Sequence, residues 1–183
     1  PNPATLALLR SDPPSFAEGG GPEGGRFTDE VADLATWTTE LDHGVLGVQG
    51  PPGTGKTYRG AHIAKALVEQ GKRVGITAMS HHAIGNFLEE IATVFAQDPM
   101  VPLQAVRKYD RPGDPIPGVT PTKKNSDLAR DDFNVVAATS WGFAGKDLLA
   151  APVDVLIVDE AGQLALVDTV VSSMSARDVV LLG

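Results

Sequence analysis

The sequence contains no cysteine, and no run of apolar residues approaches the roughly 20 that a membrane-spanning helix needs. Without cysteine the chain forms neither disulfides nor a cysteine-based metal site, so nothing points outside the cytoplasm. The apolar run at residues 4–9 is too short for the core of a secretory signal and follows no basic residue. We therefore expect a cytoplasmic protein with no membrane partner.

The sequence also lacks an excess of positive charge, since its formal net charge is −8. This value argues against a protein that coats nucleic acid with its whole surface. It does not exclude a motor that grips one strand in a local basic groove. The hydrophobic content of 42% and charged content of 21% are typical of a globular chain, and 183 residues fit one domain.

The two ends of the sequence suggest a piece of a longer protein. Residues 1–25 contain five prolines and five glycines, and we interpret residues 1–27 as a flexible connector to an upstream domain. The chain opens on Pro1 rather than methionine. It closes on the apolar run 178–183, which resembles a buried strand that stops where a loop would begin. We expect residues 28–183 to form a single domain that is truncated at its C-terminal end.

Strand and helix patterns alternate from residue 28 onward. Thr28 is a plausible N-cap for the first helical pattern, and Gly71 closes the second. Strands are expected at 45–49, 73–78, 134–139, 153–158 and 178–182, and helices at 28–41, 56–70 and 83–97. A proline-rich stretch at about 98–132 interrupts the pattern and is interpreted as a loop insertion. The alternation predicts an α/β fold with a parallel sheet flanked by helices.

The strongest motif is a phosphate-binding loop of the form G-x-x-x-x-G-K-[ST], placed between an apolar strand and a helix. Its glycines let backbone N–H groups approach phosphates, and the helix N-terminus that follows favours an anion. Lys56 is expected to reach the β- and γ-phosphates, and the Thr57 hydroxyl to bind Mg²⁺. The expected nucleotide-binding residues are Gly50, Pro51, Pro52, Gly53, Thr54, Gly55, Lys56, Thr57 and Tyr58.

An acidic pair follows the apolar strand 153–158. An acid at the carboxyl end of a buried parallel strand faces the crevice where α/β sheets bind ligands, so Asp159 is the expected Mg²⁺ partner. Glu160 is placed to take a proton from an attacking water. A metal-binding acid beside a base favours hydrolysis over transfer to a second substrate. The sequence therefore predicts a P-loop NTPase that hydrolyses its nucleotide.

The motifs together resemble superfamily 1 helicases of the Upf1-like branch. The resemblance rests on Gln49 to Thr57, on Asp-Glu-Ala-x-Gln at 159–163, on Ile76 to Asn86, on Ala137 to Trp141 and on the strand 178–183. It implies the first RecA-like domain of a helicase, with ATP and Mg²⁺ as cofactors and Gln163 among the catalytic residues beside Lys56, Asp159 and Glu160. In finer detail the chain looks like bacterial fusions of a RecB-like nuclease to such a helicase.

The same resemblance implies a groove for single-stranded DNA or RNA. Carried over, Ser80, His81 and Asn86 contact the strand at one motif, with Thr139 and Trp141 at the next. Two other interpretations stay open, since a lone Trp is often a core residue and Ser80 can cap the following helix. The adjacent His81 and His82 point apart and predict no metal site. The segment 104–125 has five basic residues against two acidic ones, which fits either a strand-guiding loop or a solvated one.

Several expectations depend on the resemblance alone. The second RecA-like domain, whose arginines reach the γ-phosphate, is missing, so the isolated fragment is expected to be nearly inactive. No glutamine upstream matches the one that reads adenine, so ATP rather than GTP is implied only by the family. An AAA+ type ATPase is a rival, although its acidic pair follows the phosphate loop much more closely. A nucleotide-dependent switch without turnover is the alternative that is not an enzyme.

Overall fold

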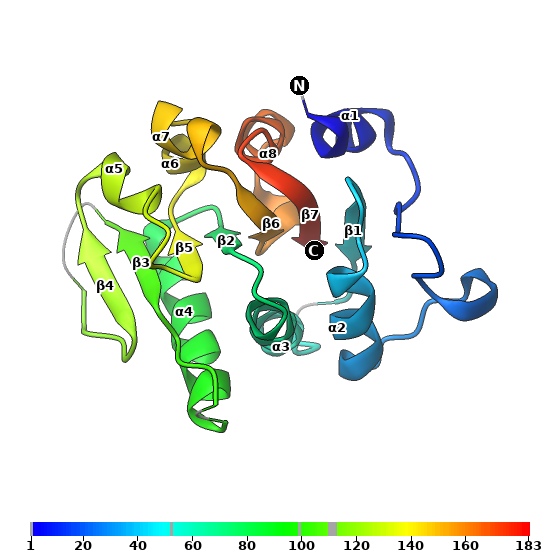
Figure 1. The fold of residues 1–183 in the computed structure, drawn as a ribbon, viewed down its shortest axis with the longest axis horizontal. Helices are drawn as coiled ribbons and strands as arrows, with labels where there is room; N and C mark the ends of the chain where they lie inside the picture. The colour runs from blue at the N-terminus through cyan, green and yellow to red at the C-terminus, as the bar shows by residue number, and fades with distance from the viewer. Residues whose placement is uncertain (1, 52, 99, 110–112) are drawn as a thin grey trace.

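The computed structural model describes residues 2–51, 53–98, 100–109 and 113–183, and its centre is a seven-stranded parallel sheet (Figure 1). The strand order is β1-β7-β6-β2-β5-β3-β4. The strands are β1 (Val45–Val48), β2 (Val74–Thr77), β3 (Ala105–Lys108), β4 (Val119–Thr122), β5 (Val135–Ala137), β6 (Val153–Val158) and β7 (Ala176–Leu182). The α-helices are α1 (Pro3–Arg10), α2 (Val31–Thr39), α3 (Lys56–Glu69), α4 (His81–Ala96), α5 (Asn125–Leu128), α6 (Ser140–Phe143), α7 (Lys146–Ala150) and α8 (Leu166–Ser173). Two short 3₁₀ helices are η1 (Glu23–Gly25) and η2 (Ala161–Gln163).

Helices cover both faces of the sheet, as a parallel sheet requires. Figure 1 shows α2, α3 and α4 on one face, and α1, α5, α6, α7 and α8 on the other. The two faces correspond to two clusters of buried apolar side chains, one built around α3 and α4 and the other around Phe143 and Leu148. The central strands β2 and β6 are buried at every position except Asp154, which explains why branched apolar residues fill most of β6.

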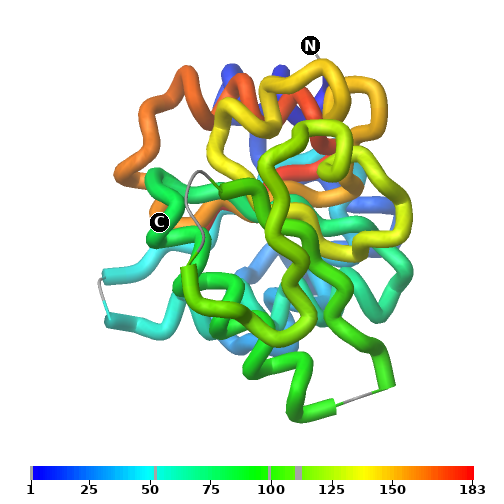
Figure 2. Tube along the Cα trace, turned by 90° about the vertical axis from the view of Figure 1, so that its left-hand side faces the viewer, coloured from blue at the N-terminus to red at the C-terminus, as the bar shows by residue number. Residues whose placement is uncertain are grey.

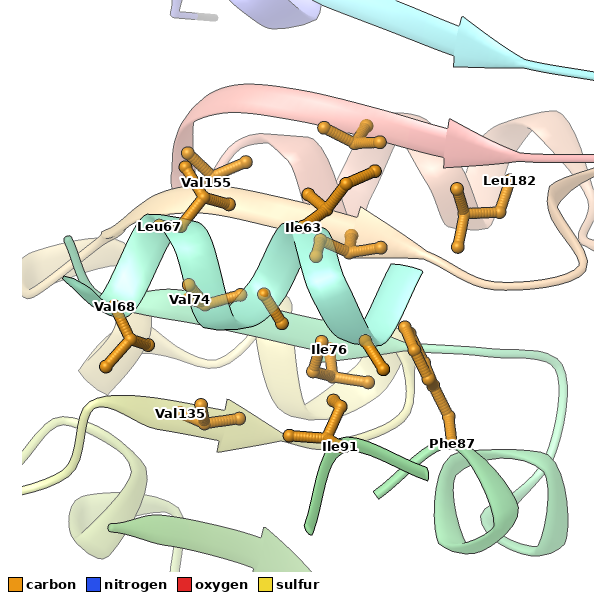
Figure 3. Close-up of a cluster of buried hydrophobic side chains, with 14 of the residues drawn as sticks. Ile63, Leu67, Val68, Val74, Ile76, Phe87, Ile91, Val135, Val155 and Leu182 are labelled. Atoms are coloured by element: carbon orange, nitrogen blue, oxygen red, sulfur yellow. The ribbon is translucent and has the colours of Figure 1, made fainter. Parts of the chain in front are cut away.

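Helix α3 shows how the sequence pattern produces the packing. Its buried residues include Ile63, Ala64, Leu67 and Val68, which recur at the spacing of one helical face. Figure 3 shows Ile63 and Leu67 pointing at the sheet, where Val74, Ile76 and Val155 meet them. The helix ends in front of Gly71, whose φ of +72° favours glycine. The N–H of Lys72 then donates to the carbonyl of Leu67 at 3.0 Å and closes the last turn.

The N-terminal residues differ from the predicted flexible connector. Residues 3–10 form α1, in which Asn2 Oδ1 accepts the N–H of Thr5 as an N-cap. The Asn2 amide also donates to the carbonyls of Ser173 and Ala176, and Ala4 is fully buried. Further on, Gly21 donates its N–H to the Glu40 carboxylate at 2.8 Å. The prediction is wrong for these residues because proline and glycine lower local propensity but do not prevent tertiary contacts.

The stretch 98–132 is not a loop insertion. Its described residues contain β3, β4 and α5, and the two strands extend the sheet beyond β5. The pattern was missed because β3 ends in two basic residues and β4 contains Pro121. Proline is tolerated there because β4 is the last strand of the described sheet.

The other expected elements are confirmed with small shifts at their ends, and so is the α/β class with a parallel sheet. The first expected helix begins later, at Val31, with Glu30 at the N-cap instead of Thr28. Thr28 donates its hydroxyl to Asp33 in the first turn. Among the described residues no helix is long and apolar enough to cross a membrane.

Candidate functional site

The predicted site residues lie in the loops and helix beginnings that follow the carboxyl ends of four strands, and these ends share one edge of the sheet. The phosphate loop follows β1, the acidic pair follows β6, and the two expected nucleic-acid motifs follow β2 and β5. In Figure 2 the phosphate loop and the loop after β6 lie on the same side of the molecule as the C-terminus. Because β6 stands between β7 and β2, its loop lies between the phosphate loop and the other two motifs.

The phosphate loop has the backbone that its glycines allow. Gly53 and Gly55 have φ values of +79° and +74°, which side-chain-bearing residues rarely adopt. A Cβ on Gly50 would lie 2.7 Å from the Thr54 hydroxyl oxygen. That hydroxyl donates to the Pro51 carbonyl at 2.8 Å and stabilises the turn. Pro52 lies outside the described residues.

Lys56 folds back over this loop. Its ammonium donates to the carbonyls of Gly50 at 2.7 Å and Pro51 at 3.0 Å. The cation therefore lies against the backbone of the loop that is expected to bind phosphates. Hydrogen bonds join the ends of β1 and β7 beneath the loop. Gly50 donates its N–H to the carbonyl of Gly183, and Gly183 donates its own N–H to the carbonyl of Val48, both at 2.9 Å.

The acidic pair differs in burial and in backbone conformation. Asp159 is only 6% exposed, and burial raises the pKa of its carboxyl, while the N–H of Glu160 donates to its Oδ1 and lowers that pKa. The neighbouring Glu160 carboxylate raises the same pKa further, and the Lys56 ammonium lowers it. A divalent cation in the pocket would favour the ionised form, so this carboxyl suits a metal partner. Glu160 has a φ of +51°, a strained conformation of the kind found at functional sites.

These residues line one cavity of about 550 Å³. Its wall is formed by Gly50, Gly53, Gly55, Lys56, Thr57, Asp159, Glu160, Gly162, Gln163 and Gly183. Thr57 and Asp159, the two expected Mg²⁺ ligands, are both part of it. Within the described residues no group of three His, Cys, Asp or Glu could hold a metal by itself. The Thr57 hydroxyl and the Asp159 carboxylate are oxygen donors of the kind that Mg²⁺ binds, and phosphates would supply further oxygens.

A second pocket of about 460 Å³ lies beside the first. It is lined by Ala78, Met79, His81, Thr139, Ser140, Trp141, Gln163, Leu164, Ala165 and Asp168. Trp141 is 82% exposed, so it is not a core residue, and Met79 is also exposed. Gln163 belongs to the walls of both pockets.

Not every expected residue lies in these pockets. The Ser80 hydroxyl accepts the N–H of Ala83 at 3.1 Å, so Ser80 caps α4. Asn86 lies one turn along the helix from His82, 3.4 Å from its ring. Tyr58 is about half exposed on α3 and packs against His62, with ring centroids 4.4 Å apart.

Sequence reasoning did not single out several pocket residues. Met79 was inside a recognised motif, but nothing marked its side chain as exposed. The walls contributed by Leu164, Ala165 and Asp168 follow only from the place of the β6 loop in the sheet.

The parallel sheet and the phosphate loop together define a P-loop NTPase domain. Residues 33–183 match the model of the AAA domain family (AAA_19), and the chain belongs to this family. Among its curated relatives, the DNA replication ATP-dependent helicase/nuclease JHS1 of Arabidopsis thaliana is 30% identical over 142 residues, 74% of this chain. The DNA replication ATP-dependent helicase/nuclease DNA2 of Saccharomyces cerevisiae is 30% identical over 130 residues, 65% of this chain. The chain spans 10% and 8% of their lengths.

The fold is also similar to a solved structure. A nuclease-deletion mutant of the Type ISP restriction-modification enzyme LlaGI, in complex with a DNA substrate mimic, superposes with a TM-score of 0.59 at 15% identity. The likeness covers 86% of this chain and 17% of that one. The family and its relatives confirm the resemblance to the first RecA-like domain of superfamily 1 helicases. The rival AAA+ type ATPase is not favoured.

Proposed function

We propose that this chain is the ATP-binding core of a helicase or translocase that couples ATP hydrolysis to movement on single-stranded DNA or RNA. The observation that carries the proposal concerns Gln163 in the loop after β6. This residue lines both the phosphate pocket and the pocket that contains Trp141. Coupling needs an element whose arrangement both ligands can bias. A single short loop between the two pockets meets that requirement.

In the phosphate pocket each residue has a distinct task. Lys56 exchanges its two loop carbonyls for phosphate oxygens, and the backbone N–H groups of the glycines orient the phosphates. Thr57 and Asp159 would hold Mg²⁺, and the ion would neutralise negative charge on the phosphates. Glu160 takes a proton from the attacking water.

The γ-phosphate still needs a positive charge that meets it in the transition state. We assign that charge to arginines of a second RecA-like domain in the same protein. Such a residue contributes on the order of 10³–10⁵ in rate, so residues 1–183 alone should bind ATP and hydrolyse it very slowly. A phosphate-release assay on this fragment, with and without single-stranded DNA, measures its rate of ATP hydrolysis. Brisk DNA-stimulated turnover would show that the site is complete without a second domain.

The second pocket suits a nucleic-acid strand. The exposed Trp141 offers an aromatic face for a base, and the polar groups of His81 and Thr139 can contact the backbone. Lys123 and Lys124 are exposed after β4 at the same edge of the sheet, where they can attract phosphates.

The two tryptophans of the chain make the proposal directly testable. Trp37 is only 7% exposed and Trp141 is 82% exposed, so a strand that stacks in the pocket should quench Trp141 alone. Titration with short deoxyuridine and uridine oligonucleotides, which share one base, should quench the emission and show which sugar is preferred. Trp141→Phe should abolish the quenching while the emission of Trp37 remains.

Anisotropy of a labelled strand gives the affinities. Trp141→Ala should weaken binding by roughly 5- to 150-fold, since stacking is worth about 1–3 kcal/mol per base. Replacing Lys123 and Lys124 by glutamine should reduce the dependence of affinity on salt. If the parent protein neither quenches nor binds the labelled strand, the nucleic-acid part of the proposal is wrong.

A further inference from the structure

Arg107 connects the two walls of the second pocket. It is a residue of β3, where its backbone is in register with Ala137 of β5, two residues before Thr139. Its side chain leaves the sheet on the side of α4, and Nη2 donates to the carbonyl of His81 at 2.7 Å. One wall of the pocket carries Thr139 and Trp141, and the other carries Met79 and His81. Arg107 is thus tied to both.

The sequence of α4 leaves room for this guanidinium. Gly85 lies one turn after His81 and is buried, although glycine inside a helix is less favourable than alanine. A Cβ at this position would lie 3.0 Å from Nη2 and 3.1 Å from Nη1 of Arg107. The glycine therefore has a packing reason, which is the close approach of the arginine to the first turn of the helix.

Among the described residues, no salt bridge explains the position of the Arg107 guanidinium. Burial lowers the pKa of Arg107, and the Glu89 carboxylate on α4 only counteracts this effect at longer range. Its Nε is buried and has no hydrogen-bond partner among the described residues. The guanidinium also lies near the N-terminus of α4, which is the positive end of the helix dipole. A cation is unfavourable in such a place, so its position calls for a reason other than stability.

We propose that Arg107 is a positioning residue that holds the first turn of α4 against the end of β5 and so sets the width of the pocket for single-stranded nucleic acid. The inference rests on the proposed function for the identity of the ligand. It assigns a role to β3, the strand that the sequence had placed in a loop. Single-stranded nucleic acid in the pocket must contact both walls at once. If the distance between the walls is fixed before binding, less conformational entropy is lost on binding.

The test compares Arg107→Met, Arg107→Lys and Gly85→Ala with the parent. Arg107→Met should weaken binding of a labelled deoxythymidine oligonucleotide about tenfold, the effect expected for losing a charged hydrogen-bond donor. Arg107→Lys should restore part of the affinity. The affinity of Gly85→Ala should lie between those of the parent and Arg107→Met, because the guanidinium can shift away from the added methyl group. Affinity for a fluorescent ATP analogue should stay unchanged in all three. Arg130→Met is the matched control, since it removes an exposed guanidinium paired with Asp132 from the same segment.

Hydrogen exchange without any nucleic acid provides a second, independent measurement. Peptides that cover residues 81–88 should exchange about tenfold faster in Arg107→Met, while peptides of the phosphate loop should not change. Equal strand affinity in parent and Arg107→Met would overturn the inference. So would a parallel loss of strand affinity, nucleotide affinity and melting temperature, because that pattern indicates a general structural role. If the parent itself binds no strand, the proposed function fails, and exchange alone decides the positioning role: unchanged exchange refutes it and faster exchange supports it.

Discussion

Replacing Lys56 by alanine isolates the contribution of one charge to nucleotide binding. Its ammonium donates to the carbonyls of Gly50 and Pro51, and it would exchange these contacts for phosphate oxygens on binding a nucleotide. Two unit charges 4 Å apart interact by about 4 kcal/mol at an effective dielectric constant of 20. Loss of the loop contacts offsets about 2 kcal/mol of this, at about 1 kcal/mol for each hydrogen bond. The remaining 2 kcal/mol, roughly, predicts a dissociation constant about 30-fold higher in Lys56→Ala.

Calorimetric titration with Mg-ADP measures this change directly. Lys65→Ala is the matched control, because it removes a lysine from the same helix whose partners, Glu69 and Asp98, lie outside the pocket. The control should bind like the parent. A thermal-shift experiment gives a second readout, since ligand at 100 times its dissociation constant stabilises the fold by about 2.7 kcal/mol. Equal affinities for parent and Lys56→Ala would refute the assignment of this loop as the phosphate site.

Three further predictions follow from the structure. In the full-length protein, Glu160→Gln should keep its affinity for ATP but lose about 10²–10⁴-fold in turnover measured by phosphate release, and an unchanged rate would mean that another group positions the water. Burial raises the folded-state pKa of Asp159, so its ionisation destabilises the fold and stability should rise as the pH falls through that pKa. Asp159→Asn should remove this pH dependence and raise the melting temperature at pH 7, by about 2–4 °C for each kcal/mol of destabilisation that is relieved. In the same variant Mg²⁺ should no longer strengthen nucleotide binding. A lower melting temperature would contradict this prediction. Gly60→Ala places a Cβ 2.5 Å from Leu182 Cδ1 and should destabilise the fold by about 1–3 kcal/mol in urea unfolding. Gly47→Ala is the control and should not destabilise the fold, because the space around its Cβ is open. Equal stabilities of the two variants would show that the core around Gly60 can rearrange.

The sequence by itself predicted the residues of the proposed nucleotide site. A glycine-rich loop between strand and helix has one arrangement in which its N–H groups converge, and the fold adopts it with Gly53 and Gly55 at positive φ. The buried strand before Asp159 was equally clear, because β6 is apolar from Val155 to Val158. These features are local, and their physical cause lies within a dozen residues of chain.

Tertiary structure alone decided which segments, distant in sequence, lie next to each other. The proline- and glycine-rich N-terminus became ordered because Asn2 finds carbonyls near residue 174, far away in sequence. The segment that contains Arg107 became two strands because β5 offered an unpaired edge, which no local pattern announces. The sharing of Gln163 between two pockets depends on the strand order, which places β6 between β7 and β2. Strand order is set by contacts between distant segments, so the adjacency of the two pockets could not be inferred from residue spacing.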